Sequence, residues 1–145
     1  MTRITVERAE AADVPGILAL LEDRHLPIDR LTDHVATALV ARQNGRIVGS
    51  AALEVYADGV LLRSVAVARL VQHQGLGRRL TDAALRLASD LHAPAVYLLT
   101  TTAERYFPKF GFERITRADV PQSVQGSVEF TAACPSSAVV MRRTL

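Results

Sequence analysis

The sequence predicts a mixed α/β fold in which an antiparallel meander of strands leads into a β-α-β unit. Two turn signals, Asn44-Gly45 and Asp58-Gly59, separate apolar runs, as tight turns between antiparallel strands do. Beyond Gly75 the apolar period changes from that of a strand to that of a helix. The run Ala95–Leu99 is apolar throughout, which is typical of a strand buried on both faces. We therefore expect a mixed sheet with helices on both faces, within one domain over residues 1–145.

The residues before the meander are expected to form a strand and two helices. Arg3–Glu7 alternates polar and apolar residues, as a half-buried strand does. Asp13 can cap a helix that carries Pro15 in its first turn. The apolar face of this helix comprises Val14, Ile17, Leu18 and Leu21. A second, shorter helix is expected over Asp29–Ala36.

The meander and the elements after it follow from the same patterns. Its three strands are expected at Ala38–Ala41, Arg46–Tyr56 and Val60–Ala68. The helix that follows carries its apolar face on Leu76, Leu80, Ala83, Ala84, Leu87 and Leu91. Gly111 is expected to close a short helix over Thr102–Phe110. The remaining expected elements are a strand at Phe112–Ile115, a short helix near Ser123–Phe130 and a last strand at Ala138–Met141.

Composition narrows the classes of function. Lys and Arg exceed Asp and Glu by 17 − 15 = 2, and no basic run interleaves with aromatic residues, so nucleic acid is not an expected partner. One cysteine, Cys134, permits neither an intrachain disulfide nor a paired-cysteine zinc site, and we expect no metal and a cytoplasmic location. The first residues lack the apolar segment of a signal peptide, and the longest apolar runs are too short to span a membrane.

The most informative segment is Val65–Leu80, in which a strand leads through Gly75-Leu76-Gly77 into an amphipathic helix. The first amides of a helix have no intrahelical partner and lie at the positive end of its dipole, so they can bind a pyrophosphate. Glycine lets that backbone approach an anion closely. A simple tight turn remains an alternative at this point. A dinucleotide-binding Gly-x-Gly-x-x-Gly is excluded because its third position is Leu80, and a P-loop is excluded because no Gly-Lys-Ser/Thr is present.

Gln72–Gly77 matches the Gln/Arg-x-x-Gly-x-Gly/Ala motif, and the chain thereby resembles the GNAT N-acetyltransferases. Val65–Val67 is similar to the strand that precedes this motif in the family, and Ala103–Phe112 is similar to the family's helix that ends in Gly-Phe, here Gly111-Phe112. The resemblance covers nearly the whole chain and implies the GNAT acyl-CoA N-acyltransferase fold. It implies acetyl-CoA as the acetyl donor and direct attack of a neutral amine on the thioester.

The resemblance also implies which residues bind the cofactor. Main-chain amides of Gln72–Arg78 would hold the pyrophosphate, the backbone of Val65 and Val67 would pair with the pantetheine arm, and the amide near Val67 would polarise the thioester. The expected cofactor-binding residues are Val65, Ala66, Val67, Gln72, His73, Gln74, Gly75, Leu76, Gly77, Arg78, Thr100 and Phe107.

Two positions depart from the family pattern. Many members carry an Asn where this chain has Thr100, and a Tyr, the general acid, where it has Phe107. Tyr106 is one residue away, which on a helix is a rotation of about 100°. Tyr106 is therefore expected either to protonate the leaving thiolate or to serve as a packing residue, with water as the other proton source.

The C-terminal third resembles two subgroups. Leu99–Thr101 and Asp119–Pro121 are similar to glutamate-type amino-acid N-acetyltransferases, and Val128–Phe130 with Cys134–Ala138 is similar to small acetyltransferases found with arsenic-resistance genes. The resemblance implies a small amino-acid-like substrate, including an arsenic-containing one. The glutamate enzymes have Arg-Ser-Lys where this chain has Ser136–Ala138.

The candidate residues for binding and activating the acceptor amine are mostly polar residues in apolar surroundings. Glu54, in an otherwise apolar strand, is the expected general base, with a pKa raised by partial burial; it could instead face solvent or pair with Arg63. Arg63 could bind a substrate carboxylate or neutralise Glu54. His25 lies in the loop where the family usually recognises substrate. The alternatives are a non-catalytic acyl-CoA-binding module and a protein N-acetyltransferase, and a homodimer is expected by analogy only.

Overall fold

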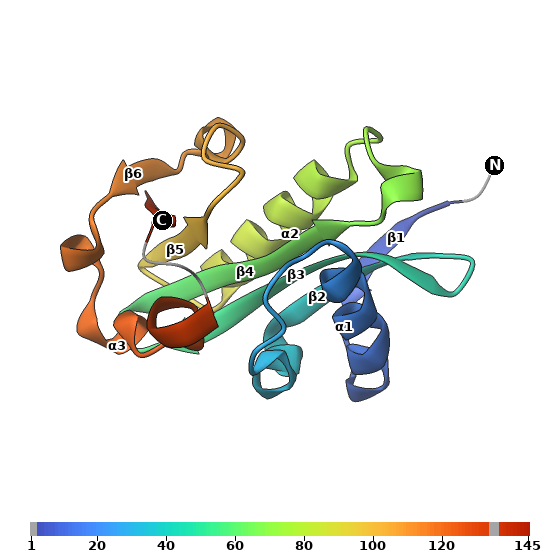
Figure 1. Cartoon of the computed structure of the whole chain (residues 1–145), viewed down its shortest axis with the longest axis horizontal. Coiled ribbons are helices and arrows are strands. Elements are labelled where there is room, and N and C mark those ends of the chain that lie inside the picture. Colours follow the sequence, from blue (N-terminus) through green and yellow to red (C-terminus); the bar gives the residue numbers. More distant parts are fainter. Residues whose placement is uncertain (1–2, 134–136) are drawn as a thin grey trace.

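The computed structural model describes residues 3–133 and 137–145, which form one continuous seven-stranded sheet with helices on both faces (Figure 1). The strands run in the order β1-β2-β3-β4-β5-β7-β6, and every neighbouring pair is antiparallel except β4 and β5. Their bounds are β1 Thr5–Arg8, β2 Ala38–Gln43, β3 Arg46–Tyr56, β4 Gly59–Val67, β5 Ala95–Thr100, β6 Glu113–Ile115 and β7 Val139–Thr144.

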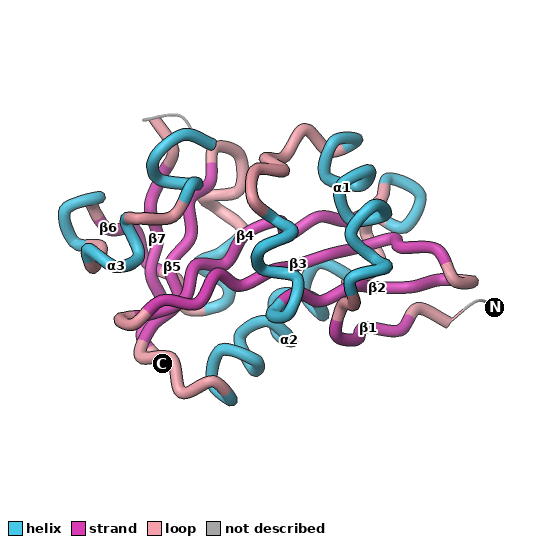
Figure 2. The backbone as a smooth tube through the Cα atoms, turned by 90° about the horizontal axis from the view of Figure 1, so that it is seen from below, coloured by secondary structure: helices cyan, strands magenta, loops and turns pink. Residues whose placement is uncertain are grey.

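The two long helices lie on opposite sides of the sheet, as Figure 2 shows. α2 (Leu76–Asp90) covers one face through its buried residues Leu80, Ala84, Leu87 and Ala88. α1 (Val14–Asp23) covers the other face, where Ile17 and Leu21 pack on Val40 and Ala52. α3 (Gln122–Gln125) lies on the α1 side and contributes Val124 to a smaller cluster with Leu61 and Tyr97. The mixed sheet with helices on both faces is confirmed.

The meander follows the predicted turns. Asn44 and Gly45 both have positive φ, at 54° and 77°, as a two-residue hairpin turn requires. The buried run at β5 is confirmed as well, because its first four residues are all buried. Local signals in the sequence are sufficient for these elements, since turn chemistry and apolar period both act over short segments.

Three expected helices are shorter or tighter than predicted. The expected helix Asp29–Ala36 is a 3-10 helix over Leu31–Thr37. Thr102–Phe110 is not a continuous helix: only Phe107–Phe110 is helical, as a 3-10 turn that ends at Gly111, whose φ is 85°. Pro108 lacks the amide that an α-helix would use there. The expected helix near Ser123–Phe130 is divided into α3 and a π-helical segment, Glu129–Ala133.

β4 and β5 separate soon after they meet, and this separation positions the site. The two strands pair only at Val60 with Val96 and at Leu61 with Tyr97. Beyond Leu61, β4 has no strand partner on its β5 side among the described residues. On its β3 side the register shifts between Ser50 and Ala52, where Ser64 takes a φ of 60°. This β-bulge re-aims the backbone at the mouth of the gap.

Within the described ranges, no helix combines the length and the apolarity needed to cross a membrane.

Candidate active site

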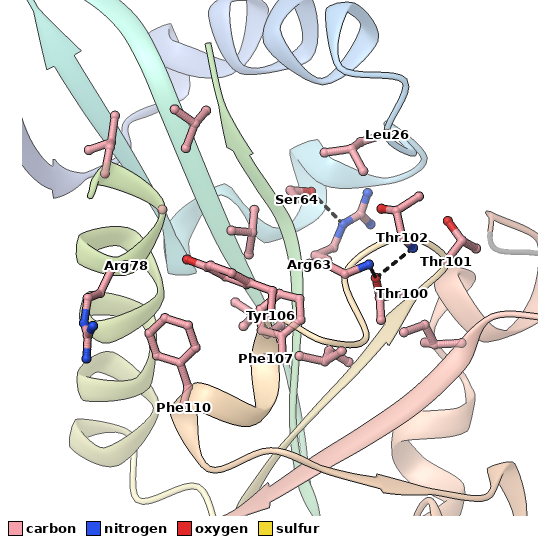
Figure 3. Close-up of a pocket in the computed structure, with 18 of the residues that line it drawn as sticks. Leu26, Arg63, Ser64, Arg78, Thr100, Thr101, Thr102, Tyr106, Phe107 and Phe110 are labelled. Atoms are coloured by element: carbon pink, nitrogen blue, oxygen red, sulfur yellow. Dashed lines mark hydrogen bonds between the residues drawn. The ribbon is translucent and has the colours of Figure 1, made fainter. Parts of the chain in front are cut away.

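A cavity of about 770 Å³ occupies the gap between β4 and β5 (Figure 3). One end, the α2 end, is lined by Gln72, His73 and Gly75–Arg78. The other end, the Arg63 end, is lined by His25–Pro27, Arg63, Ser64 and Glu129. Between them lie the residues that follow β5, Thr100–Ala103, and the aromatic side chains of Tyr106, Phe107 and Phe110. The cavity therefore connects the α2 side of the sheet with its α1 side.

The α2 end has the geometry of an anion site. Gly75 occupies the cap position with a φ of 76°, and the first intrahelical bond runs from the Arg79 amide to the Gly75 carbonyl at 3.1 Å. The amides of Leu76, Gly77 and Arg78 precede this bond, so they lie at the positive end of a 15-residue helix. Arg78 lines the cavity at the same place, with its guanidinium 6.0 Å from the Phe110 ring centre.

The Arg63 end is built on a buried ion pair. Arg63 Nη1 lies 2.9 Å from Glu54 Oε2, and both side chains are fully buried. Tyr56 donates a 2.5 Å hydrogen bond to Glu54, and the Ser127 hydroxyl donates another. His34 Nε2 lies 3.7 Å from the same carboxylate. The carboxylate thus joins β3, β4, the 3-10 helix Leu31–Thr37 and the segment after α3.

This network changes the acid-base properties of its members. Burial alone would raise the pKa of Glu54, but the hydrogen bonds from Ser127, Tyr56 and Arg63 together hold that pKa below its ordinary value. Burial, followed by the bond to Glu54, raises the pKa of Tyr56 to about 12. Glu54 therefore remains a carboxylate, and Tyr56 remains a neutral donor, near neutral pH.

Comparison with known proteins identifies the family of this chain. The family described as "Acetyltransferase (GNAT) domain" matches residues 34–114, more than half of the chain. An amino-acid acetyltransferase of Mycobacterium tuberculosis is 32% identical over 133 residues, covering 84% of this chain and 75% of that relative. The chain belongs to the GNAT acetyltransferase family. The expected family is thereby confirmed, and the cavity is placed in a GNAT domain.

Further relatives and solved structures agree with this identification. An amino-acid acetyltransferase of Neisseria meningitidis is 24% identical over 83% of this chain, which spans 30% of that relative. The N-acetylglutamate synthase of Neisseria gonorrhoeae, solved with coenzyme A and N-acetyl-glutamate, superposes with a TM-score of 0.84 at 22% identity, over the whole chain and 36% of that protein. A Mycobacterium tuberculosis protein solved with CoA has a TM-score of 0.82 at 27% identity, covering 97% of this chain and 99% of that one. The GNAT fold is confirmed.

Most of the expected cofactor residues line the cavity of this GNAT domain. These are Val65, Val67, Gln72, His73, Gly75, Leu76, Gly77, Arg78, Thr100 and Phe107. Ala66 does not, because side chains alternate along a strand and its own packs on the α1 side. Gln74 is exposed in the turn and does not line the cavity either.

Tyr106 lines the cavity with its hydroxyl directed toward α2, away from Arg63 and Ser64 (Figure 3). The hydroxyl lies 3.0 Å from the position that a Cβ on Gly77 would occupy. The ring makes an edge contact with Phe107, with centres 5.2 Å apart. Burial raises the pKa of Tyr106, against a hydrogen bond with Thr81 that lowers it. The phenol therefore stays protonated, and both expected roles, proton donor and packing residue, remain compatible with its position.

Two expectations for the acceptor residues need correction. The expectation of a raised Glu54 pKa is wrong, because three hydrogen bonds outweigh burial. Glu54 also lies behind Arg63 and does not line the cavity. The alternative in which Arg63 neutralises Glu54 is the arrangement observed. His25 lines the cavity at the end of α1 with a φ of 57°, and its side chain is exposed.

Sequence reasoning did not single out Tyr56, Ser127 or Glu129 as site residues. Tyr56 lies two positions after Glu54 and so shares its face of β3, which is a signal that the sequence contains. Ser127 and Glu129 are polar positions between Val124 and Phe130, but a pairing 73 residues away from Glu54 leaves no local signal. Cys134, Pro135 and Ser136, part of the arsenic-related resemblance, lie outside the described residues.

The lowered pKa of Glu54 predicts a dependence of stability on acid. A group whose pKa is lower in the folded state stabilises the fold above its ordinary pKa, about 4.5 for this residue, and loses that effect as the pH falls below it. We therefore expect Glu54→Gln to flatten the decline of unfolding free energy below about pH 4.5. Urea titrations followed by circular dichroism at neutral and acidic pH measure this. Glu22→Gln, at an exposed site on α1, should keep the slope of the parent protein; equal slopes for both variants would contradict the assignment.

Proposed function

We propose that this GNAT domain transfers the acetyl group of acetyl-CoA to the amine of a small, amino-acid-like substrate by direct attack. The observation that carries the proposal is the cavity in the β4–β5 gap, with an anion site at one end and a buried ion-pair network at the other. The cofactor's pyrophosphate would lie on the amides of Leu76–Arg78. Its pantetheine arm would pair with the open edge of β4, along Val65 and Val67.

Roles for the remaining residues follow from their positions. The Val67 amide would polarise the thioester carbonyl, and the Tyr106 phenol or a water would protonate the thiolate. We assign Glu54 a positioning role in place of the base role, since it stays ionised and is shielded by Arg63. The acceptor would enter at the Arg63 end, beside His25 and Glu129. Two relatives support this substrate class, because they are named amino-acid acetyltransferases. An arsenic-containing amino-acid analogue belongs to the same class.

Release of free CoA from acetyl-CoA tests the proposal directly. Each common amino acid, and arsenic and phosphorus analogues of glutamate, would be compared with a blank that lacks amine. Amine-dependent release is the expected result. Tight CoA binding without release for any amine would contradict it, and would favour a non-catalytic acyl-CoA-binding domain. Two observations favour this second candidate, the non-catalytic domain. Phe107 occupies the position where the family usually has a tyrosine, and the Tyr106 hydroxyl is directed toward α2.

Gly75→Ala isolates the role of the backbone at the α2 end. Gly75 and Gly45 have nearly the same φ, 76° and 77°, and an added Cβ meets nothing within 4 Å at either site. Alanine should cost about 1–2 kcal/mol of unfolding free energy at both positions, because φ is left-handed. Only Gly75→Ala should also weaken CoA binding, by roughly tenfold, or about 1.4 kcal/mol. Isothermal calorimetry on both variants measures this, and equal affinities would remove Gly75 from the cofactor site.

A further inference from the structure

One carboxylate lines the Arg63 end of the cavity. Glu129 opens the π-helical segment Glu129–Ala133, and only 6% of its side chain is exposed. Its Oε2 lies 3.8 Å from Arg63 Nη2, which is an ion-pair distance, although it is too long for a hydrogen bond. A largely buried carboxylate that borders a cavity offers a strong interaction to any cation that enters, because water screens the pair poorly there.

Most hydrogen-bond donors of Arg63 are already bonded to acceptors within the protein. Its Nε donates to Ser64 Oγ at 3.1 Å, and Nη1 donates to Glu54 and to the Asp29 carbonyl at 2.9 and 2.7 Å. Nη2 donates to the Pro27 carbonyl at 3.2 Å. A guanidinium has five N–H donors, so at most one is left for the cavity. Arg63 therefore cannot present the parallel pair of donors that holds a substrate carboxylate.

The position of Glu129 is fixed by the same buried network. Its backbone amide donates to Ser127 Oγ at 3.1 Å, and the Ser127 hydroxyl donates to Glu54. Glu54 is anchored in β3 and paired with Arg63 of β4. Two hydrogen bonds thus connect Glu129 to the middle of the sheet, which holds its carboxylate at a defined place.

The other basic groups that line the cavity do not add positive charge beside Glu129. Arg78 lies on α2, and Lys109 lies 5.5 Å from the Tyr106 ring centre, toward the α2 end. His73 belongs to the turn before α2, which leaves His25 at the Arg63 end, where its side chain is exposed. The residues outside the described ranges contain no Lys, Arg or His in their sequence: Met1, Thr2, Cys134, Pro135 and Ser136. The Arg63 end therefore favours a cation over an anion.

We propose that Glu129 binds the ammonium group of the acceptor and removes one of its protons before attack, an inference that rests on the proposed function. The carboxylate takes a proton from R–NH₃⁺ and leaves a neutral amine. The nitrogen lone pair then forms a bond to the thioester carbon, and the bond to sulfur breaks with its electron pair. The thiolate takes a proton from the Tyr106 phenol or a water, and the second proton lost by nitrogen replaces it, which yields the N-acetyl product and CoA. The proton on Glu129 passes to solvent.

The same arrangement selects among acceptors. A second carboxylate on the substrate would face Glu129 and an Arg63 without free paired donors. L-Glutamine and L-glutamate have nearly the same shape and differ by one charge, so they report this selection directly. We expect L-glutamine to be acetylated at least about tenfold more efficiently than L-glutamate, since like-charge juxtaposition costs on this scale.

The experiment compares Glu129→Gln with the parent protein and with Glu22→Gln, the exposed control on α1. Acetyl-CoA turnover is measured with the best common amino acid, and CoA affinity is measured by calorimetry. Glu129→Gln should lower kcat about 100-fold, as loss of a general base does, while CoA affinity stays within about twofold. Glu129→Asp, which keeps the charge, should recover part of the rate, and Glu22→Gln should match the parent.

Each possible result that differs from these expectations contradicts one part of the inference. A Glu129→Gln variant that keeps kcat within about threefold overturns the role of Glu129 and leaves the proposed function intact. Loss of CoA affinity together with turnover also overturns it, because the residue would then be structural. A parent protein that prefers L-glutamate overturns the charge selection. A parent protein that binds CoA but acetylates no amino acid overturns the proposed function, and this inference with it.

Discussion

Replacing Arg63 with Met is expected to lower the free energy of unfolding by about 3–5 kcal/mol, the cost of leaving a buried charge without its partner. The Glu54 carboxylate would lose its 2.9 Å ion pair while it remains fully buried. The loop Pro27–Asp29 would lose two hydrogen bonds to its carbonyl groups. Urea denaturation followed by far-ultraviolet circular dichroism gives the change directly.

An exposed ion pair provides the control for that measurement. Arg114 lies 3.7 Å from Glu104, and both side chains are more than half exposed, at 71% and 53%. Arg114→Met should therefore cost less than about 1 kcal/mol, because water screens such a pair. Combining Arg63→Met with Glu54→Gln should recover part of the loss by removing the uncompensated charge. If Arg63→Met costs no more than Arg114→Met, the network does not stabilise the fold as described.

Gly77→Val is expected to weaken CoA binding by at least about 100-fold, or about 2.8 kcal/mol. A Cβ at this position would lie 3.0 Å from the Tyr106 hydroxyl and 3.8 Å from Val67 Cγ2. The Tyr106 hydroxyl would have to shift away from the new side chain, which would stand beside the amides expected to hold the pyrophosphate. Calorimetric titration with CoA measures the loss.

Two further variants separate crowding from a general effect of substitution. Gly126→Val adds the same side chain away from this cavity, where the nearest atom to a new Cβ is the Ser123 carbonyl oxygen at 3.5 Å, and it should keep the parent affinity. Gly77→Ala should bind CoA more tightly in a Tyr106→Phe background, since removing the hydroxyl leaves the ring carbon at 3.8 Å as the nearest contact. No gain from Tyr106→Phe would contradict the placement of that hydroxyl.

The elements set by short-range signals were predictable from the sequence. Asn44-Gly45 places a hairpin turn, and Gly75–Gly77 before an apolar helical period places the start of α2. The motif that indicates the family lies entirely within one strand, one turn and one helix start. The expected cofactor-binding residues of this segment line the cavity, apart from Ala66 and Gln74, and their binding of CoA stays a prediction.

The Arg63 end was less predictable, because its groups meet through long-range packing. Glu54 and Arg63 face each other across a hairpin, but the hydrogen bond that lowers the Glu54 pKa most comes from Ser127. The β-bulge at Ser64 was not predictable, because no glycine or proline marks its position in the sequence. A polar residue in an apolar strand indicates that something buried will pair with it, and the partner is decided only by the tertiary structure.

Under the proposed function, the short contact between β4 and β5 would make the acetyl donor a structural component of the sheet as well as a reactant. Among the residues that the structure describes, two pairs, Val60–Val96 and Leu61–Tyr97, join the β1–β4 half of the sheet to the β5–β7–β6 half through strand pairing. Under the proposed function, a pantetheine chain would lie in this opening and would add amide groups where the pairing of β4 with β5 stops. The free energy of CoA binding would then help to hold the two halves together, so we expect the CoA-bound and free proteins to differ in rigidity along this seam.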